Sequence, residues 1–334
     1  MKILVTGGTG YIGSHTVVEL VRAGHEVVIL DNLFNSKIEV LDKIEKITGA
    51  RPKFYEVDLL DYEATLGILK SEKFGAVMHF AGMKAVGESV EKPLRYYENN
   101  VQGAVNLLKA MQETGVKRLI FSSSATVYGN KGAESARLVE TMTTGVGITS
   151  PYGWTKAMIE QIIRDVCVAD PEFSAAILRY FNPVGADRSG LIGEDPNGIP
   201  NNLMPIVAKV YFGEVPRLVI YGDDYETEDG SCERDFIHVV DLAKGHLAAL
   251  EKMKPGVSTY NLGTGKAMSV LKIVKVFEEM AGRELPKEIG KRRAGDLAVL
   301  CADPSLAWQE LGWKTELTIE DAVRDTLNYL KNNS

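Results

Sequence analysis

The sequence predicts an α/β fold, in which a doubly wound parallel sheet is followed by a smaller α/β C-terminal lobe. Three observations lead to this prediction. Short apolar runs alternate with helical stretches, a glycine-rich turn follows the first run, and the alternation loosens beyond about residue 182. Strands and helices that alternate in this way favour right-handed crossovers and a parallel sheet.

The expected strands are short and mostly apolar, as is typical of parallel strands buried on both faces. The first covers residues 2–6, and the others are expected at residues 26–31, 53–57, 76–80, 118–122 and 175–181. Helices are expected between the strands. They include residues 11–23, which Gly24 should end, and residues 95–114 and 152–169.

The second half of the chain is expected to lie across the edge of this sheet. A strand is expected at residues 217–221, and helices at residues 203–212, 239–253, 269–281, 304–311 and 318–331. Thr318 and Asp321 resemble a capping box at the start of the last helix. We therefore expect a first lobe over residues 1–182 and a second over residues 183–334, with some crossing of the chain between them.

Composition limits the class of protein. Of the 334 residues 45% are hydrophobic and 25% charged, which is ordinary for a globular chain, and the net charge of -7 disfavours nucleic acid as a partner. No run approaches 18 apolar residues, and glycine interrupts the N-terminal run too early for a signal peptide. Three widely spaced cysteines and scattered histidines predict neither disulfides nor a metal site. We expect a cytoplasmic protein without a membrane partner.

A dinucleotide site is predicted at the turn between the first strand and the first helix. Gly7, Gly10 and Gly13 permit a sharp turn and the close approach of a diphosphate to the helix N-terminus. Asp31 ends the second strand, where it can bind both adenosine ribose hydroxyls and repel a 2′-phosphate. The pattern predicts a Rossmann-type domain that binds NAD rather than NADP; a purely structural glycine turn is the alternative.

Residues that follow the third and fourth strands are also expected to lie along the dinucleotide. Asp58 follows the third strand and is placed to meet the adenine. The alternative is that it serves only as a loop or cap residue, as an Asp after a strand often does. The residues that follow the fourth strand can line the dinucleotide path; they are Phe80, Ala81 and Gly82.

The reacting group is predicted near the start of the helix at residues 152–169. Tyr152 and Lys156 are four residues apart and therefore share one helix face. We expect the ammonium, together with a positively charged nicotinamide ring, to lower the pKa of the Tyr152 phenol from its ordinary value of about 10. Ser124 is expected at the carboxyl edge of the fifth strand, where its hydroxyl can bridge substrate and phenolate. A surface pair and a polar turn are the alternatives.

Longer strings of the sequence resemble a known family. TGGTGYIG, SSSATVYG and YGWTK resemble the extended short-chain dehydrogenase/reductase superfamily. Along essentially the whole chain, further strings resemble the UDP-glucose 4-epimerase family within it; they include HFAGMKAVGESVEKP (79–93), RYFNPVGA (179–186), RDFIHVVDLA (234–243) and RRAGDLA (292–298).

This resemblance implies an isomerase that interconverts UDP-galactose and UDP-glucose through a transient 4-keto sugar. Tyr152 would take the proton of the sugar 4-hydroxyl with the assistance of Ser124, and tightly bound NAD would carry the hydride of C4. The resemblance also implies a homodimer formed through the helices at residues 95–114 and 152–169. The alternative is that the chain's own lobe covers their apolar side chains.

The family pattern implies further binding residues. For NAD it adds Tyr11, Ile12, Asn32, Asn35, Ser36, Leu59, Lys84, Asn99 and Tyr180. For the UDP-sugar it implies Lys84, Ser124, Tyr152, Asn182, Asn202, Leu203, Arg234, Phe236, Arg293, Asp296 and Leu300. The two arginines suit a diphosphate, because guanidinium groups match phosphate oxygens, and Asp296 suits a ribose diol.

Three features depart from the family pattern. Leu300 stands where a tyrosine closes the pocket to N-acetylated sugars and a small residue admits them, so secondary UDP-GlcNAc/UDP-GalNAc epimerisation is a hypothesis. Phe236 replaces a frequent tyrosine, and residues 130–147 have an unusual composition.

Other functions are compatible with the same fold. A sugar-nucleotide 4,6-dehydratase needs an acid and a base beside the serine, where this chain has Ala125 and Thr126. A uronate epimerase needs a cation for the C6 carboxylate. A non-catalytic NAD-binding sensor need not combine Ser124, Tyr152 and Lys156.

Overall fold

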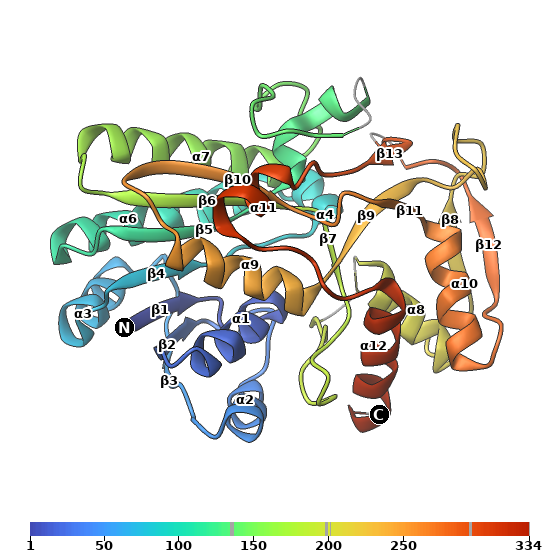
Figure 1. Cartoon of the computed structure of the whole chain (residues 1–334), viewed down its shortest axis with the longest axis horizontal. Helices are drawn as coiled ribbons and strands as arrows, with labels where there is room; N and C mark the ends of the chain where they lie inside the picture. The colour runs from blue at the N-terminus through green and yellow to red at the C-terminus, as the bar shows by residue number, and fades with distance from the viewer. Residues whose placement is uncertain (134–136, 198–199, 201, 294–295, 334) are drawn as a thin grey trace.

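A seven-stranded parallel sheet forms the centre of the larger layer of the molecule (Figure 1). The structure is a computed structural model that describes all residues except 134–136, 198–199, 201, 294–295 and 334. The strand order is β10-β6-β5-β4-β1-β2-β3, which reverses between β1 and β4. The strands are β1 (Lys2–Thr6), β2 (Glu26–Asp31), β3 (Lys53–Glu56), β4 (Ala76–His79), β5 (Arg118–Ser124), β6 (Ser174–Tyr180) and β10 (Gly256–Leu262). The predicted doubly wound sheet is therefore confirmed.

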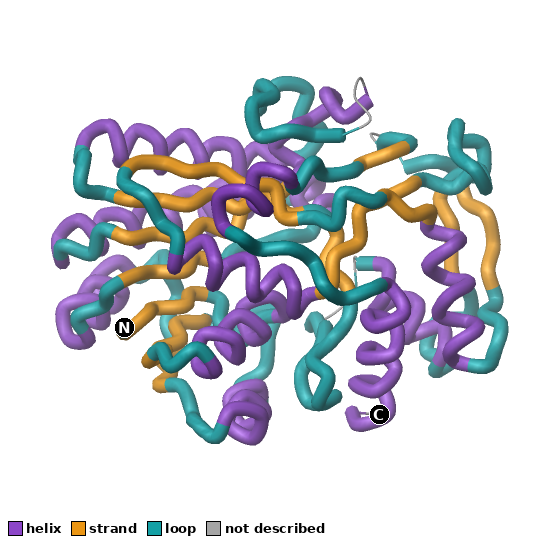
Figure 2. Tube along the Cα trace, viewed as in Figure 1, coloured by secondary structure: helices purple, strands orange, loops and turns teal. Residues whose placement is uncertain are grey.

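Helices cover both faces of this sheet, as Figure 2 shows. Successive residues of β1 point to opposite faces, so Ile3 and Val5 belong to one buried cluster and Leu4 to the other. The first cluster includes side chains of α1 (Tyr11–Arg22), α2 (Val40–Thr48), α9 (Val239–Glu251) and α11 (Ser305–Leu311). The second includes side chains of α3 (Tyr62–Glu72), α6 (Gly103–Thr114) and α7 (Pro151–Ala169).

A smaller α/β layer lies at the right of the view in Figure 1. Its four-stranded sheet consists of β11 (Ala267–Ser269), β9 (Glu233–His238), β13 (Val299–Leu300) and β7 (Asn182–Val184), and its two-stranded sheet of β8 (Leu218–Tyr221) and β12 (Lys287–Gly290). The helices of this layer are α8 (Leu203–Tyr211), α10 (Val270–Ala281) and α12 (Ile319–Asn333). Apolar side chains of all three pack into one core, which includes Val207, Phe277 and Leu327.

One prediction needs correction, and one strand of the main sheet was not predicted. The helix expected over residues 95–114 is α5 (Pro93–Tyr96), a π-helix (Tyr97–Gln102) and α6, and it is preceded by α4 (Val86–Glu91). Strand β10, which the sequence analysis did not predict, joins the main sheet beside β6. Its segment GVSTYNL mixes polar with apolar residues, which hides a strand that only the completed sheet stabilises.

The remaining strands and helices predicted for both halves match observed elements to within about two residues, which is the usual disagreement at element ends. The capping box of α12 is also confirmed. The Thr318 backbone nitrogen donates to the Asp321 carboxylate at 2.9 Å, and the Asp321 nitrogen donates to the Thr318 hydroxyl at 3.2 Å. The division into lobes at residue 182 stays a prediction.

Among the described residues, no helix has both the length and the apolar character needed to cross a membrane.

Candidate active site

The glycine turn packs tightly between β1 and α1. Gly7 has a φ of 71°, and a Cβ there would lie 2.6 Å from the Ala81 nitrogen. A Cβ at Gly13 would lie 2.1 Å from the Gly7 carbonyl oxygen. Gly10 is the N-cap of α1, and no described side chain caps this helix start. The backbone N–H groups of the first turn of α1 can therefore donate to an anionic ligand. The residues present fit the diphosphate of a dinucleotide.

Asp31 is held by its own neighbourhood at the end of β2. Its Oδ2 accepts hydrogen bonds from the Thr9 nitrogen at 3.1 Å and the Thr9 hydroxyl at 2.6 Å. Its Oδ1 accepts from the Leu33 nitrogen at 3.0 Å, and the residue is 8% exposed. These bonds fix the carboxylate at the cavity wall, which is where the sequence analysis expects the adenosine ribose.

A cavity of about 620 Å³ extends from the glycine turn to the end of β5. The structure brings every residue predicted for NAD to its wall. These residues are Gly7, Gly10, Tyr11, Ile12, Gly13, Asp31, Asn32, Asn35, Ser36, Asp58, Leu59, Phe80, Ala81, Gly82, Lys84, Asn99 and Tyr180. Their individual roles stay predictions.

Ser124, Tyr152 and Lys156 line the same cavity from β5 and α7. Ser124 is the last residue of β5, as predicted, and Ser150 caps α7 by accepting from the Gly153 nitrogen at 3.2 Å. Pro151 at the first helical position fits this cap, because a helix start needs no donor there. Tyr152 and Lys156 thereby occupy the first turns of α7 and point to the end of β5.

The protein groups around Tyr152 supply only part of the electrostatics that the sequence analysis expects. Burial raises the pKa of the phenol above its ordinary value, and the hydrogen bond with Ser124 lowers it only in part. Lys156 donates from Nζ to the Ser122 carbonyl at 2.7 Å, and Nζ lies 6.0 Å from the centre of the Tyr152 ring. Burial also lowers the pKa of Lys156 to about 8. The protein alone therefore does not lower the pKa of the phenol, because desolvation outweighs the stabilising contacts.

A buried ion pair fixes the end of β5 against α7. Arg179 of β6 donates to both carboxylate oxygens of Glu160, from Nε at 2.9 Å and from Nη2 at 2.6 Å. The Ser123 hydroxyl donates to the same carboxylate at 2.6 Å. Glu160 lies one turn after Lys156 in α7, and Ser123 precedes Ser124. The network therefore constrains the geometry between the serine and the two α7 side chains.

Two neighbouring asparagines of the π-helix have different surroundings. Asn99 lines the cavity. Asn100 is buried, accepts from the Met83 nitrogen at 2.8 Å, and donates to the Thr155 hydroxyl at 3.1 Å. A helix with this wider turn is frequent at functional sites, where it re-aims side chains. Here the hydrogen bonds of Asn100 connect the segment after β4 to α7.

The residues predicted for the UDP-sugar fall into two groups. Asn182, Asn202 and Leu300 line the cavity beside Tyr152, whereas Leu203 and Phe236 pack against the core of the smaller layer. Arg234 and Arg293 flank Asp296, with nitrogen–oxygen distances of 3.4 and 3.0 Å, outside the lining of this cavity. Their role as a diphosphate clamp stays a prediction.

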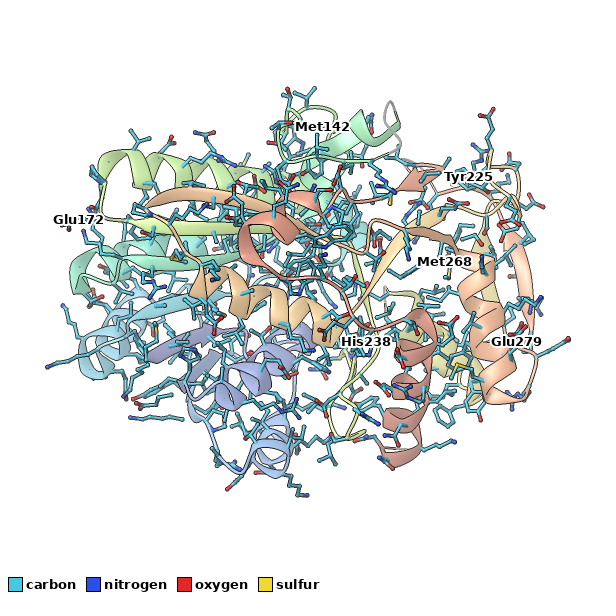
Figure 3. The ribbon with its side chains drawn as sticks, in the orientation of Figure 1. Met142, Glu172, Tyr225, His238, Met268 and Glu279 are labelled. Atoms are coloured by element: carbon cyan, nitrogen blue, oxygen red, sulfur yellow. The ribbon has the colours of Figure 1, made fainter. Side chains whose placement is uncertain are left out.

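Leu300 lines the cavity and also belongs to a small apolar cluster. It packs with Met142 against buried side chains that include Tyr128 and Phe181. Met142 lies in the segment after β5 at the top of Figure 3. A bridge between Leu138 and Ala302 ties that segment to the chain just after Leu300. Leu138 and Met142 of residues 130–147 therefore lie close to Leu300. Residues 134–136 of this stretch lie outside the described part of the chain.

Several residues at the cavity were not predicted from sequence. The Thr9 hydroxyl donates to Asp31, and the Ser122 carbonyl accepts from Lys156. Glu194 lines the cavity from the loop after β7. Glu194 stands among the glycines and prolines of residues 190–200, where the sequence signals only a turn. Its place in the site depends on tertiary structure.

This cavity, with its glycine turn and its serine, tyrosine and lysine, is the kind of site found in dinucleotide-dependent enzymes. A family model described as "NAD dependent epimerase/dehydratase family" matches residues 3–263. The chain belongs to this family.

The most similar proteins give a narrower class. The chain is 53% identical to a UDP-glucose 4-epimerase of Bacillus subtilis, over 100% of this chain and 98% of the relative. A crystal structure of UDP-glucose 4-epimerase from Bifidobacterium longum in complex with NAD+ and UDP is 50% identical, with a TM-score of 0.96, over 100% and 99% of the two chains. One from Stenotrophomonas maltophila, with bound NAD and formylated UDP-arabinopyranose, is 46% identical, with a TM-score of 0.96, over 100% and 98%.

Proposed function

We propose that this chain is an NAD-dependent isomerase that interconverts UDP-galactose and UDP-glucose through a transient 4-keto sugar. One observation carries the proposal. A single cavity is lined by every residue predicted for NAD together with Ser124, Tyr152 and Lys156. Full-length identity of about half with UDP-glucose 4-epimerases supports the same conclusion.

In this proposal Tyr152 accepts the proton of the sugar 4-hydroxyl and later returns it. Ser124 bridges the sugar hydroxyl and the phenol, because a hydroxyl donates and accepts at once. When bound, NAD supplies the hydride acceptor and donor at C4. The chain contributes orientation and a proton acceptor held in place by α7.

The raised pKa of Tyr152 defines what the site requires for this chemistry. A buried phenol is a poor base at neutral pH unless positive charge lies close to it. Lys156 provides one such charge from within the chain, and its bond to the Ser122 carbonyl holds the ammonium beneath the phenol. We infer that the phenolate forms when the positive charge of the bound nicotinamide ring adds to that of Lys156.

The direct test is to incubate the purified protein with UDP-galactose, without added coenzyme, and to follow the formation of UDP-glucose. Conversion by protein whose NAD content has been confirmed supports the proposal. No conversion by NAD-loaded protein would refute it. A sugar-nucleotide 4,6-dehydratase would instead release a 4-keto-6-deoxy sugar; the Thr126 hydroxyl, which donates to the Ser124 oxygen at 3.1 Å, offers no carboxylate for that reaction.

A second activity, epimerisation of UDP-GlcNAc and UDP-GalNAc, is supported by one residue. Leu300 lines the cavity and is smaller than the tyrosine that closes this position in the family. Comparing turnover of UDP-GalNAc and UDP-galactose tests this activity, and no turnover of the acetylated sugar would exclude it.

We also propose a cytoplasmic homodimer. The three cysteines are free and buried, which suits a reducing compartment. Val168 and Met158 of α7 are 83% and 40% exposed, and apolar side chains on α7 support an interface with a second copy. Light scattering of the wild type and of Met158→Asp tests this; a monomeric wild type would refute it.

A further inference from the structure

Residues 187–197, which we call the crossing segment, connect β7 to α8 along the wall of the cavity. Its inward residues contribute directly to the cavity lining: Leu191, Ile192, Gly193, Glu194, Asp195 and Pro196. In Figure 1 it belongs to the yellow-green loop that lies between α2 and α12 in the view. The sequence analysis assigned no function to this segment.

One end of the crossing segment is fixed to the body of the protein. Just before it, the Gly185 carbonyl accepts a hydrogen bond from the Tyr11 hydroxyl at 2.7 Å. Asn328 of α12 donates to the Arg188 carbonyl at 3.0 Å. A Cβ at Gly193 would lie 2.6 Å from the Tyr329 ring, so this close packing requires glycine.

The other end is bonded to the loop after β2, on the far side of the glycine turn. The Asn197 nitrogen donates to the Asn35 side-chain oxygen at 3.0 Å, and its side-chain amide donates to the Phe34 carbonyl at 3.3 Å. Lys37 and Asp195 form an exposed ion pair at 2.5 Å. The crossing segment therefore bridges the two walls between which the dinucleotide is proposed to lie.

Glu194 joins the two halves of the site from the middle of this segment. Its Oε1 accepts from the Lys84 ammonium at 3.0 Å and from the Asn202 amide at 2.5 Å. The Glu194 side chain is 8% exposed. Lys84 follows β4 and is predicted to contact NAD, whereas Asn202 precedes α8 and is predicted to contact the UDP-sugar.

A nearly buried carboxylate in a cavity for two diphosphates is unfavourable unless it is paired. Lys84 offsets the charge of Glu194, and the carboxylate in turn orients the Asn202 amide.

We propose that Glu194 is a positioning residue that keeps the crossing segment closed over the dinucleotide and orients Asn202 for the UDP-sugar. This inference rests on the proposed function and adds to it a residue that controls retention of the cofactor. It separates two roles within one ion pair: Lys84 contacts ligand, and Glu194 acts through Lys84 and Asn202. The neighbouring pair of Lys37 and Asp195 is exposed, so we expect it to contribute little.

The experiment measures exchange of bound NAD for labelled NAD in the holoenzyme, together with kcat and KM for UDP-galactose at saturating NAD. Glu194→Ala removes both bonds, and Glu194→Gln keeps an oxygen that can accept from Asn202. Glu279→Ala, at an exposed carboxylate of α10 outside the cavity lining, is the control. We expect Glu194→Ala to exchange NAD about tenfold faster, because each lost bond involved a charged group.

We further expect Glu194→Ala to raise KM for UDP-galactose about fivefold with kcat within about twofold of wild type. Glu194→Gln should recover much of the KM, while its NAD exchange stays fast, and Glu279→Ala should match the wild type. Exchange and KM at wild-type values in Glu194→Ala would overturn the inference, as would equal acceleration by Glu279→Ala. The isosteric Glu194→Gln decides the exchange rate if the alanine variant does not fold.

Failure of this inference is distinct from failure of the proposed function. If the wild type does not convert UDP-galactose, the proposed function fails. If it converts the sugar but Glu194→Ala retains NAD and KM, only the role of Glu194 fails.

Discussion

The ammonium nitrogen of Lys156 lies 2.7 Å from the carbonyl oxygen of Ser122. This hydrogen bond holds the nitrogen 6.0 Å from the centre of the Tyr152 ring. Lys156 is 6% exposed, and burial lowers its pKa to about 8. At neutral pH, keeping this ammonium inside the folded protein therefore costs about 3 kcal/mol relative to an exposed lysine. A charge maintained at such a cost, beside the proposed proton acceptor, points to a role in the reaction.

Lys156→Met should separate activity from stability. We expect kcat to fall by about 10²-fold or more, because the phenolate loses its nearby charge, while the melting temperature rises. Turnover of UDP-galactose and calorimetry on the same preparation measure both. A variant that loses stability but keeps its turnover would contradict this account of Lys156.

The Asp31 carboxylate should set the preference for NAD over NADP. Asp31→Asn keeps the size of the side chain but removes the charge that repels a 2′-phosphate. We expect the Kd for NAD to rise about tenfold and the preference for NAD to fall by a similar factor. Titration of apoprotein with both dinucleotides measures these constants. Asp42→Asn, on the exposed surface of α2, is the control, and an unchanged preference in Asp31→Asn would refute the assignment.

Leu300 should control access for N-acetylated sugars. Leu300→Ser enlarges the cavity wall and should raise the ratio of UDP-GalNAc to UDP-galactose turnover about tenfold. Leu300→Tyr should abolish turnover of the acetylated sugar while UDP-galactose is still converted. Equal ratios in both variants and the wild type would show that another residue limits the pocket.

The buried histidines should make the fold sensitive to acid. Burial lowers the pKa of His246 to about 4, below the value near 6.5 expected in the unfolded chain. The unfolded state therefore binds more protons, and stability falls as the pH drops from about 6.5 toward 4. His246 alone should cost about 2 kcal/mol at pH 5.

Urea unfolding of the wild type and of His246→Gln at pH 7.5 and 5.0 measures this effect. The variant should lose about 2 kcal/mol less than the wild type between the two pH values. His25→Gln, at a half-buried site near the N-terminus, is the control and should change this difference much less. An identical loss in wild type and His246→Gln would contradict the assignment.

The parallel sheet was predictable because its strands are apolar runs bounded by glycines and polar turns. The glycine turn and the Tyr152–Lys156 spacing are likewise local patterns, so the cavity wall they form could be expected from sequence. Strand β10 could not be, because its polar residues gain their strand partners only when the chain returns to β6. The resemblance to a known family, rather than local pattern, suggested Lys84 and Asn202.

Two features of the site depend on tertiary structure alone. Glu194 meets Lys84 across 110 residues of sequence, and no local spacing predicts that contact. The pKa of Tyr152 is expected to fall when both Lys156 and the nicotinamide ring lie close to the phenol. In the protein alone burial raises it, since desolvation depends on everything packed around the phenol and not only on its helix neighbours.

The central claim is that the phenol of Tyr152 exchanges a proton with the sugar 4-hydroxyl. The most direct test is the turnover of UDP-galactose by Tyr152→Phe, in protein whose NAD content equals that of the wild type. We predict a fall in kcat of about 10²- to 10⁴-fold with NAD still bound. Turnover at the wild-type rate by this NAD-loaded variant would contradict the account.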